Sequence, residues 1–271
     1  MIEVKNGSVH IGKKPILSGV AFNAMPGAIT AIIGPNGSGK TTLLKAISGD
    51  LPYGGSIRVH GREINALKPW EMAAMRAVLP QSSSLSFPFT IREVVRLGLT
   101  AGRTGASRSQ TDDIVEEALA RVDLQGFSAR FYQELSGGEQ QRVQLARVLC
   151  QVWHPVVDDM PRYLFLDEPI SSLDIRHQLV ILDIARDFAR RGGGVLAILH
   201  DLNLTAMYAD NILVMHQGKV RDFGAPDAVL KDDLLQSVFE CNLRVSAVPA
   251  GNNAFVLPQS VTAGKIHSSN A

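Results

Sequence analysis

The residue pattern with the clearest chemistry is a glycine-rich loop at residues 34–41 that matches G-x-x-x-x-G-K-[ST]. Successive backbone N–H groups of such a loop can surround a phosphate, and a helix that begins there adds favourable partial charge. Lys40 would reach the β- and γ-phosphates of a nucleotide, and the Thr41 hydroxyl would ligate Mg²⁺. A plain glycine-rich turn is the alternative, which the flanking strand and helix patterns disfavour. The predicted nucleotide-binding residues are Gly34, Pro35, Asn36, Gly37, Ser38, Gly39, Lys40, Thr41 and Thr42.

Two adjacent carboxylates, Asp167 and Glu168, follow an apolar run much later in the chain. A carboxylate at the end of a strand beside a phosphate loop can hold Mg²⁺ or its waters, which is the role predicted for Asp167. Glu168 is predicted to accept a proton from the attacking water. The alternative is a structural acidic pair held in salt bridges, which the phosphate loop in the same chain disfavours.

Three apolar runs predict the strands that position these residues. Residues 28–33, 163–166 and 195–199 are almost continuously apolar, as expected for strands buried on both faces of a parallel sheet. The polar residues that follow the runs would gather at the carboxyl edge of the sheet, where open α/β sheets bind ligands. Between residues 90 and 150, apolar residues recur at spacings of three and four and predict helices, with an exposed loop at 101–109.

Shorter elements are expected toward both ends of the chain. Residues 2–4, 9–11 and 56–60 predict strands, with turn signals at Asn6-Gly7 and Gly54-Gly55. Residues 212–215 and 220–222 flank a polar segment with a glycine and predict a hairpin. The tail from about residue 259 is polar and small, and we expect it to be frayed.

Residues 135–143 read L-S-G-G-E-Q-Q-R-V, which is similar to the signature motif of ATP-binding cassette (ABC) ATPases. Gln81 stands at the position of the family's Q-loop, residues 171–174 at its D-loop and His200 at its switch, all in the family's order. The resemblance covers residues 1–245 and implies an α/β P-loop NTPase fold of the ABC ATPase type. A RecA-like and β core (1–85 and 150–245) would carry an N-terminal antiparallel β subdomain and a helical subdomain at about 86–149. Residues 246–271 would form a partly flexible extension.

The resemblance also implies how the motifs cooperate. Two copies of the chain would pair head to tail, so that the signature of each closes the ATP of the other. Glu168 would activate water, His200 would contact the γ-phosphate, and Gln81 would sense both Mg²⁺ and the attacking water. The family's other nucleotide contacts fall on Ser136, Gly137, Gly138, Glu139 and Asp174. The family usually stacks an aromatic side chain on adenine, and His10 is the candidate in a stretch without Phe, Tyr or Trp.

Composition restricts the class of protein further. Lys and Arg total 27 against 26 Asp and Glu, so the net charge of +1 argues against bulk attraction to nucleic acid. Two cysteines are too few for a disulfide scaffold. No signal-peptide pattern and no apolar stretch of about 18 residues is visible. We therefore expect a chain that does not itself span a membrane.

A single cassette of this size resembles the separate ATPase subunit of a bacterial importer, and most of all those that serve iron chelates, hemin and cobalamin. Residues 151–162 lengthen the segment before Asp167, and such an extension recurs in hemin importer ATPases. Hemin is therefore the expected cargo, with a ferric siderophore or cobalamin as alternatives. The expected partners are a multi-span permease dimer and, indirectly, a periplasmic hemin-binding protein, at the cytoplasmic face of the inner membrane. A soluble ABC ATPase of iron–sulfur cluster assembly is the alternative from another class.

Overall fold

The computed structural model describes residues 1–81, 85, 87–101, 108–249, 251 and 254–261. A six-stranded sheet forms its centre, in the order β12-β11-β3-β10-β9-β6. Five strands run parallel, and β12 pairs with β11 antiparallel. These strands are β3 Ile29–Ile33, β6 Arg76–Leu79, β9 Tyr163–Asp167, β10 Gly194–Ile198, β11 Asn211–His216 and β12 Lys219–Gly224. The three predicted buried strands and the predicted hairpin are thus confirmed.

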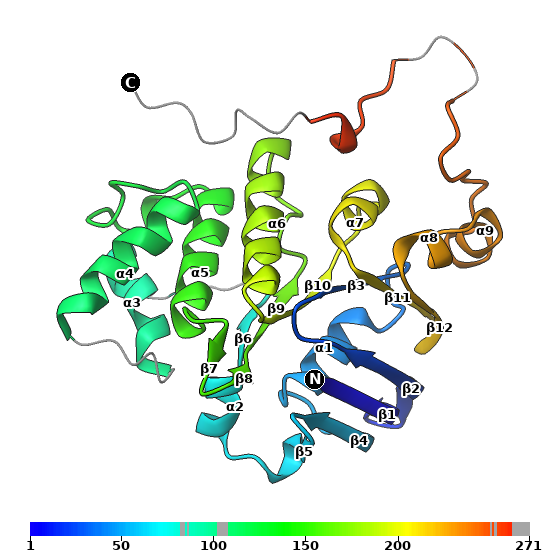
Figure 1. Cartoon of the computed structure of the whole chain (residues 1–271), viewed down its shortest axis with the longest axis horizontal. Coiled ribbons are helices and arrows are strands. Elements are labelled where there is room, and N and C mark those ends of the chain that lie inside the picture. Colours follow the sequence, from blue (N-terminus) through cyan, green and yellow to red (C-terminus); the bar gives the residue numbers. More distant parts are fainter. Residues whose placement is uncertain (82–84, 86, 102–107, 250, 252–253, 262–271) are drawn as a thin grey trace.

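A second, antiparallel sheet has the order β2-β1-β4-β5 and lies at one side of the molecule (Figure 1). Its strands are β1 Ile2–Ile11, β2 Lys14–Ala24, β4 Gly54–Val59 and β5 Arg62–Glu63. The prediction of a turn at Asn6-Gly7 is wrong, because β1 continues through both residues. Its register with β2 shifts on either side of Gly7, and Asn6 has φ 50°. The same residue types that favour turns also form β-bulges, which bend a strand without ending it.

Two hydrophobic cores lie on the two faces of the parallel sheet. Phe165, Leu196 and Ile198 point to the face shared with the antiparallel sheet and α1 (Lys40–Ile47). Leu164 and Ala197 point to the face covered by helices. The alternation follows from the two-residue period of a strand and explains why these runs are apolar on every residue.

Helices follow the predicted pattern between residues 90 and 151. The helix α3 (Ile91–Ala101) packs on α5 (Gly137–Gln151), and Gly98 lets them approach, since a Cβ there would collide with the Arg147 carbonyl. Of the predicted loop at 101–109, Ala101 belongs to α3 and Arg108 begins α4, while residues 102–107 lie outside the described residues. The remaining helices are α2 Pro69–Met75, α4 Arg108–Arg121, α6 Ile175–Arg190, α7 Leu202–Tyr208, α8 Pro226–Val229 and α9 Asp232–Phe239, with 3₁₀ turns at Ile64–Ala66, Tyr132–Glu134 and Pro258–Ser260.

Two peripheral segments complete the fold. The short strands β7 (Val156–Val157) and β8 (Met160–Pro161) pair as a small hairpin within the extension at 151–162. In the C-terminal segment, the Gln259 side chain donates to the Asn203 carbonyl of α7 at 3.1 Å. We expect fraying from about residue 259, but residues 259 and 260 belong to the 3₁₀ turn Pro258–Ser260, and residues 262–271 lie outside the described residues. None of the described helices combines the length and apolar character needed to cross a bilayer.

Candidate active site

The glycine-rich loop joins the carboxyl end of β3 to α1, as predicted. Gly34 has φ 146° and Gly39 has φ 100°, in the region that favours glycine. A Cβ on Gly34 would collide with the Met215 carbonyl oxygen, and a Cβ on Gly39 would lie 2.6 Å from Leu17 Cδ2. The loop therefore needs glycine at both positions, for backbone conformation and for close packing against β2 and β11.

Lys40 and Ser38 are buried polar groups within this loop. The Lys40 ammonium donates to the carbonyl oxygens of Gly34 at 2.9 Å and Pro35 at 3.0 Å. Burial lowers the pKa of Lys40, while the charges of Glu168 and Asp167 raise it. The Ser38 hydroxyl is buried and has no hydrogen-bond partner among the described residues. A buried cation and an unpartnered hydroxyl at a helix N-terminus are suited to a polyphosphate ligand.

Asp167 ends β9 beside the start of α1. Its Oδ1 accepts a hydrogen bond from Thr41 Oγ1 at 3.3 Å, and the residue is only 4% exposed. Burial raises the pKa of Asp167 and the neighbouring Glu168 charge adds to this, whereas the Thr41 hydrogen bond lowers it. A divalent cation would compensate the buried negative charge, and hydroxyl and carboxylate oxygens are ligands that Mg²⁺ prefers. The donor set therefore fits Mg²⁺, and the metal roles of Thr41, Asp167 and Gln81 stay predictions.

Glu168 brings the three predicted catalytic residues into direct contact. Its Oε2 accepts a hydrogen bond from Gln81 Nε2 at 2.9 Å, and its Oε1 lies 2.8 Å from His200 Nε2. Gln81 follows β6, and His200 follows β10, so parallel strands deliver both to the carboxyl edge of the sheet. Glu168 itself has φ 53°, a left-handed conformation that is uncommon for glutamate.

The signature residues begin α5 with a capping box. The Ser136 backbone N–H and hydroxyl donate to Glu139 Oε2 at 2.8 and 2.6 Å. These bonds, the hydroxyl's first, lower the pKa of Glu139, and the N–H of Glu139 donates back to the Ser136 hydroxyl. Glu139 therefore stabilises the helix N-terminus here. The nucleotide contacts predicted for Ser136, Gly137, Gly138 and Glu139 stay predictions.

Gln141 is a site residue to which the sequence reasoning gave no role. Its Nε2 donates to the Glu168 carbonyl oxygen at 3.2 Å, and its Oε1 accepts from the Ser172 hydroxyl at 2.6 Å. A signal was present in the sequence, because Gln141 lies three residues after Gly138 and thus on the same face of the helix.

Two further predicted nucleotide contacts, Asp174 and His10, lie at the N-cap of α6 and on β1. Asp174 caps α6, with its Oδ1 accepting from the His177 backbone N–H at 2.9 Å. His10 is exposed near the end of β1, where it pairs with Pro15 of β2. The neighbouring Leu17 of β2 lies beside Gly39. Stacking of His10 on adenine stays a prediction.

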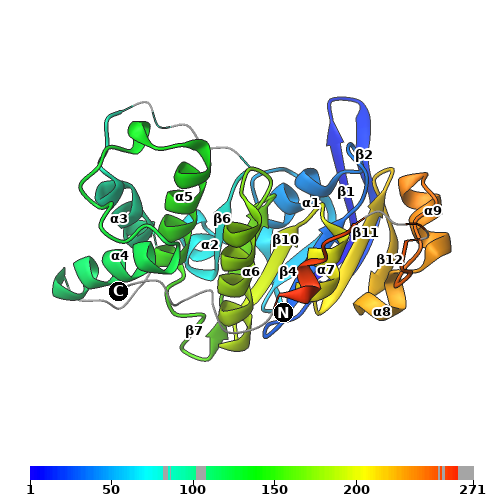
Figure 2. The same cartoon turned by 90° about the horizontal axis from the view of Figure 1, so that it is seen from above.

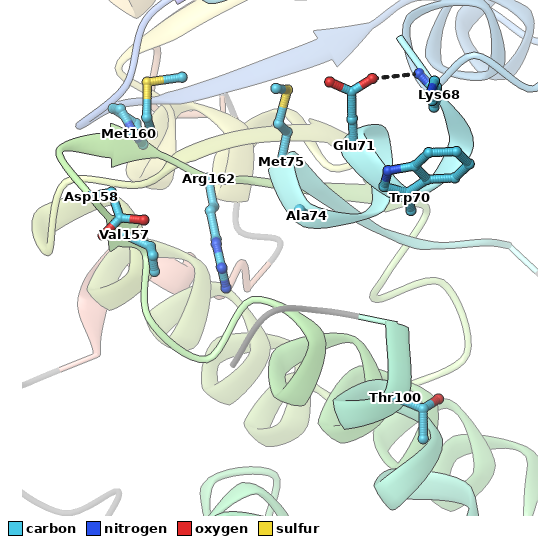
Figure 3. A pocket seen from close by; sticks show the side chains of 11 residues that line it. Lys68, Trp70, Glu71, Ala74, Met75, Thr100, Val157, Asp158, Met160 and Arg162 are labelled. Atoms are coloured by element: carbon cyan, nitrogen blue, oxygen red, sulfur yellow. Dashed lines mark hydrogen bonds between the residues drawn. The ribbon is translucent and has the colours of Figure 1, made fainter. Parts of the chain in front are cut away.

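A cavity with a volume of about 620 Å³ lies elsewhere in the described part of the chain. Figure 3 shows Trp70 and Met75 of α2 on one side and Met160 and Arg162 of the extension on the other. Met75 precedes β6 and Arg162 precedes β9, so this cavity is at the amino edge of the parallel sheet. The phosphate loop follows the carboxyl end of β3, so the cavity is separate from the candidate site.

Comparisons with known proteins agree with this geometry. A family model described as "ABC transporter" matches residues 17–171. The chain is 65% identical to "Hemin import ATP-binding protein HmuV" of Mesorhizobium japonicum (strain LMG 29417 / CECT 9101 / MAFF 303099), over 96% of this chain and 99% of that protein. It is 60% identical to the protein of the same name from Chelativorans sp. (strain BNC1), over 96% and 99% of the two chains. A solved structure titled "Structure of ATP binding subunit of ABC transporter" superposes with a TM-score of 0.76 at 25% identity, covering 89% of this chain and 96% of that one.

These findings confirm the predicted α/β ABC ATPase fold. Along the chain, the phosphate loop at the end of β3, the signature at the start of α5 and the carboxylates at the end of β9 stand in the order expected for that fold. The division into subdomains and the individual site roles stay predictions. The chain belongs to the ABC transporter family, as an ATP-binding subunit.

Proposed function

We propose that this chain is the ATP-hydrolysing subunit of a bacterial importer that takes up hemin through a separate membrane permease. The assignment of hemin as the cargo rests on sequence similarity. Proteins that are 65% and 60% identical to this chain over nearly its full length are named as hemin import ATP-binding proteins. The contacts around Glu168 support hydrolysis, because a proton acceptor, a histidine and a glutamine converge beside the phosphate loop.

The site residues divide the chemistry among them. Lys40 and the N-terminal amides of α1 stabilise negative charge on the phosphates. Glu168 accepts a proton from water as the water oxygen attacks the γ-phosphorus, and the bond from that phosphorus to the bridging oxygen breaks to release ADP and phosphate. Gln81 and His200 hold the two carboxylate oxygens of Glu168 in place. Thr41 and Asp167 would hold Mg²⁺, which would supply positive charge to neutralise the nucleotide's phosphates. Gln81 would contact the same ion.

The proposed assembly contains two copies of this chain. One helix N-terminus cradles the chain's own phosphates, and the N-terminus of α5 supplies a second set of amides. One chain cannot easily direct both helix N-termini at the same γ-phosphate. In a head-to-tail dimer that encloses two ATP molecules, each γ-phosphate would meet the N-terminus of α1 from one chain and that of α5 from the other. The dimer would bind a multi-span permease dimer at the cytoplasmic face of the inner membrane, and meet a periplasmic hemin-binding protein only through that permease.

Co-purification from native membranes tests the transport assignment. The Glu168→Gln chain would be captured in the presence of ATP, with Lys40→Ala as the matched control that is expected to lose ATP-dependent capture. We expect a multi-span permease to co-purify. Capture of iron–sulfur assembly proteins in its place would favour the soluble alternative and overturn the transport role.

Cargo is then tested with the wild-type chain and that permease in proteoliposomes. We expect hemin, presented by the permease's own binding protein, to stimulate ATP hydrolysis and to accumulate in the lumen. Stimulation by a ferric siderophore or cobalamin, with none by hemin, would overturn hemin as the cargo and leave the transport role intact.

A further inference from the structure

Two polar bridges join the signature helix α5 to the segment 171–174 that follows Glu168. The first bridge is Gln141, which bonds the Glu168 carbonyl oxygen at 3.2 Å and the Ser172 hydroxyl at 2.6 Å. Beside it, Gly138 packs so closely that a Cβ there would lie 3.0 Å from Leu173 Cδ2. The first turn of α5 is therefore in direct contact with the chain that leaves the catalytic carboxylate.

The second bridge passes through the turn that follows α4. Arg142, one residue after Gln141, is only 8% exposed and donates from Nη1 to the carbonyl oxygens of Val122 at 3.0 Å and Asp123 at 2.8 Å. The Asp123 carboxylate in turn pairs with Arg176 Nη2 at 2.8 Å, in the first turn of α6. The backbone of the turn is thus bonded to α5, while the Asp123 carboxylate of the same turn is paired with α6 (Figure 2 shows these helices from above).

The bridge ends at Asp174, the N-cap of α6. The Asp174 carboxylate accepts from the His177 backbone N–H at 2.9 Å and lies 2.9 Å from His177 Nδ1. The backbone bond and then the ring bond hold the pKa of Asp174 below its ordinary value. The other ring nitrogen of His177 lies 3.6 Å from Asp123 Oδ2, so the ring stands between two carboxylates. The Asp123 side chain is therefore linked to the last residue of segment 171–174.

We propose that Asp123 is a positioning residue that fixes the N-terminus of the signature helix relative to Glu168. Gln141 and Arg142 are adjacent in α5 and anchor that helix in two directions, toward Glu168 and toward the turn at Asp123. Loss of the Asp123 carboxylate would free the second anchor from α6 and leave the first intact.

This inference rests on the proposed function, in which α5 closes over the partner's ATP while Glu168 acts on the ATP of its own chain. A displacement of the N-terminus of α5 relative to Glu168 would slow ATP hydrolysis in the dimer. It leaves nucleotide binding to one chain unchanged, because the phosphate loop is not part of either bridge.

The test compares Asp123→Asn, Arg176→Gln and the double variant with Glu117→Gln. Asparagine suits position 123 because Asp123 has φ 61°, a conformation that Asn tolerates well. Glu117→Gln is the matched control, since it breaks the Glu117–Arg121 ion pair of 2.6 Å, which is confined to α4. Hydrogen exchange of amides 136–141 is measured on the nucleotide-free chains, together with kcat and KM for ATP.

We expect either single variant to speed exchange of amides 136–141 about two- to fivefold, the range for one partly exposed ion pair. The same variants should lower kcat and leave KM unchanged, with the double variant no slower than the singles. Glu117→Gln should change none of these values. Unchanged exchange at 136–141, or additive effects in the double variant, would overturn the role of Asp123. The exchange measurement decides this without activity, whereas a wild-type chain that fails to hydrolyse ATP would overturn the proposed function.

Discussion

Replacing Glu168 by glutamine removes the proton acceptor while changing one atom of the side chain. In the structure, Oε1 and Oε2 of Glu168 face His200 and Gln81 at 2.8 and 2.9 Å. Glutamine keeps one carbonyl oxygen, so one of these contacts can persist, and the side chain is 17% exposed and can accommodate the amide. We therefore expect Glu168→Gln to fold and to bind ATP through the intact phosphate loop.

The expected loss is in the chemical step. A general base contributes about 10²–10⁴ in rate, and a factor of ten corresponds to about 1.4 kcal/mol, so the barrier should rise by roughly 3–5 kcal/mol. Steady-state phosphate release would give kcat, and calorimetric titration with ATP would give the affinity. The expected result is a kcat reduced at least a hundredfold with an affinity within about threefold of the wild type.

A matched control shows whether a loss of kcat comes from removing the base or simply from replacing a glutamate in a left-handed conformation. Glu240 has φ 55°, close to the 53° of Glu168, and it ends α9 away from the site. Glu240→Gln should therefore keep the wild-type kcat. If Glu168→Gln retained more than about a tenth of the wild-type kcat, Glu168 would not be the base and the mechanism proposed here would be refuted.

Three further predictions concern residues of the same site. Asp167→Asn should raise the Tm of the nucleotide-free chain at pH 7, because burial raises the pKa of Asp167 and disfavours its charged form. The gain should vanish below about pH 4, where the carboxyl is protonated in both the folded and unfolded states, and equal Tm values at pH 7 would contradict it. Gly39→Ala should lower the free energy of unfolding by about 1–3 kcal/mol in denaturant titrations and abolish ATP binding, because of its φ and the contact with Leu17. Gly27→Ala, at φ 77° with nothing within 4 Å of the added Cβ, should keep ATP binding. Lys40→Ala should weaken ATP affinity at least tenfold by calorimetry, since a charged hydrogen bond contributes about 1.5–3 kcal/mol, and unchanged affinity would exclude its role.

The sequence predicts the parts of the fold that depend on short stretches of chain. The phosphate loop and the buried strands are each specified within about ten residues, by glycine spacing and by apolar runs. The prediction of a turn at Asn6-Gly7 was wrong because it also used only a short stretch of chain. Local residue types favour a left-handed conformation there, and only pairing with β2 and β4 decides that it is a bulge inside a strand.

Contacts between distant residues could not be predicted from spacing alone. Gln81 and Glu168 are 87 positions apart, and Gln141 and Glu168 are 27 apart. Family resemblance supplied the first pair, because both residues belong to motifs with known roles. It gave no role to Gln141, and it gave no indication of Asp123, whose importance depends on how α4, α5 and α6 pack.

The backbone at Glu168 explains how two adjacent carboxylates acquire different roles. Asp167 still pairs with Ile198 in the parallel sheet, and there its side chain is buried against Thr41. The next residue leaves the strand at φ 53°, and its carboxylate instead contacts Gln81 and His200. A left-handed glutamate is locally unfavourable, and such conflicts between local preference and fold concentrate at functional sites. The sequence therefore identifies the two carboxylates, but only the fold shows that a strained turn between them separates the proposed metal ligand from the proposed base.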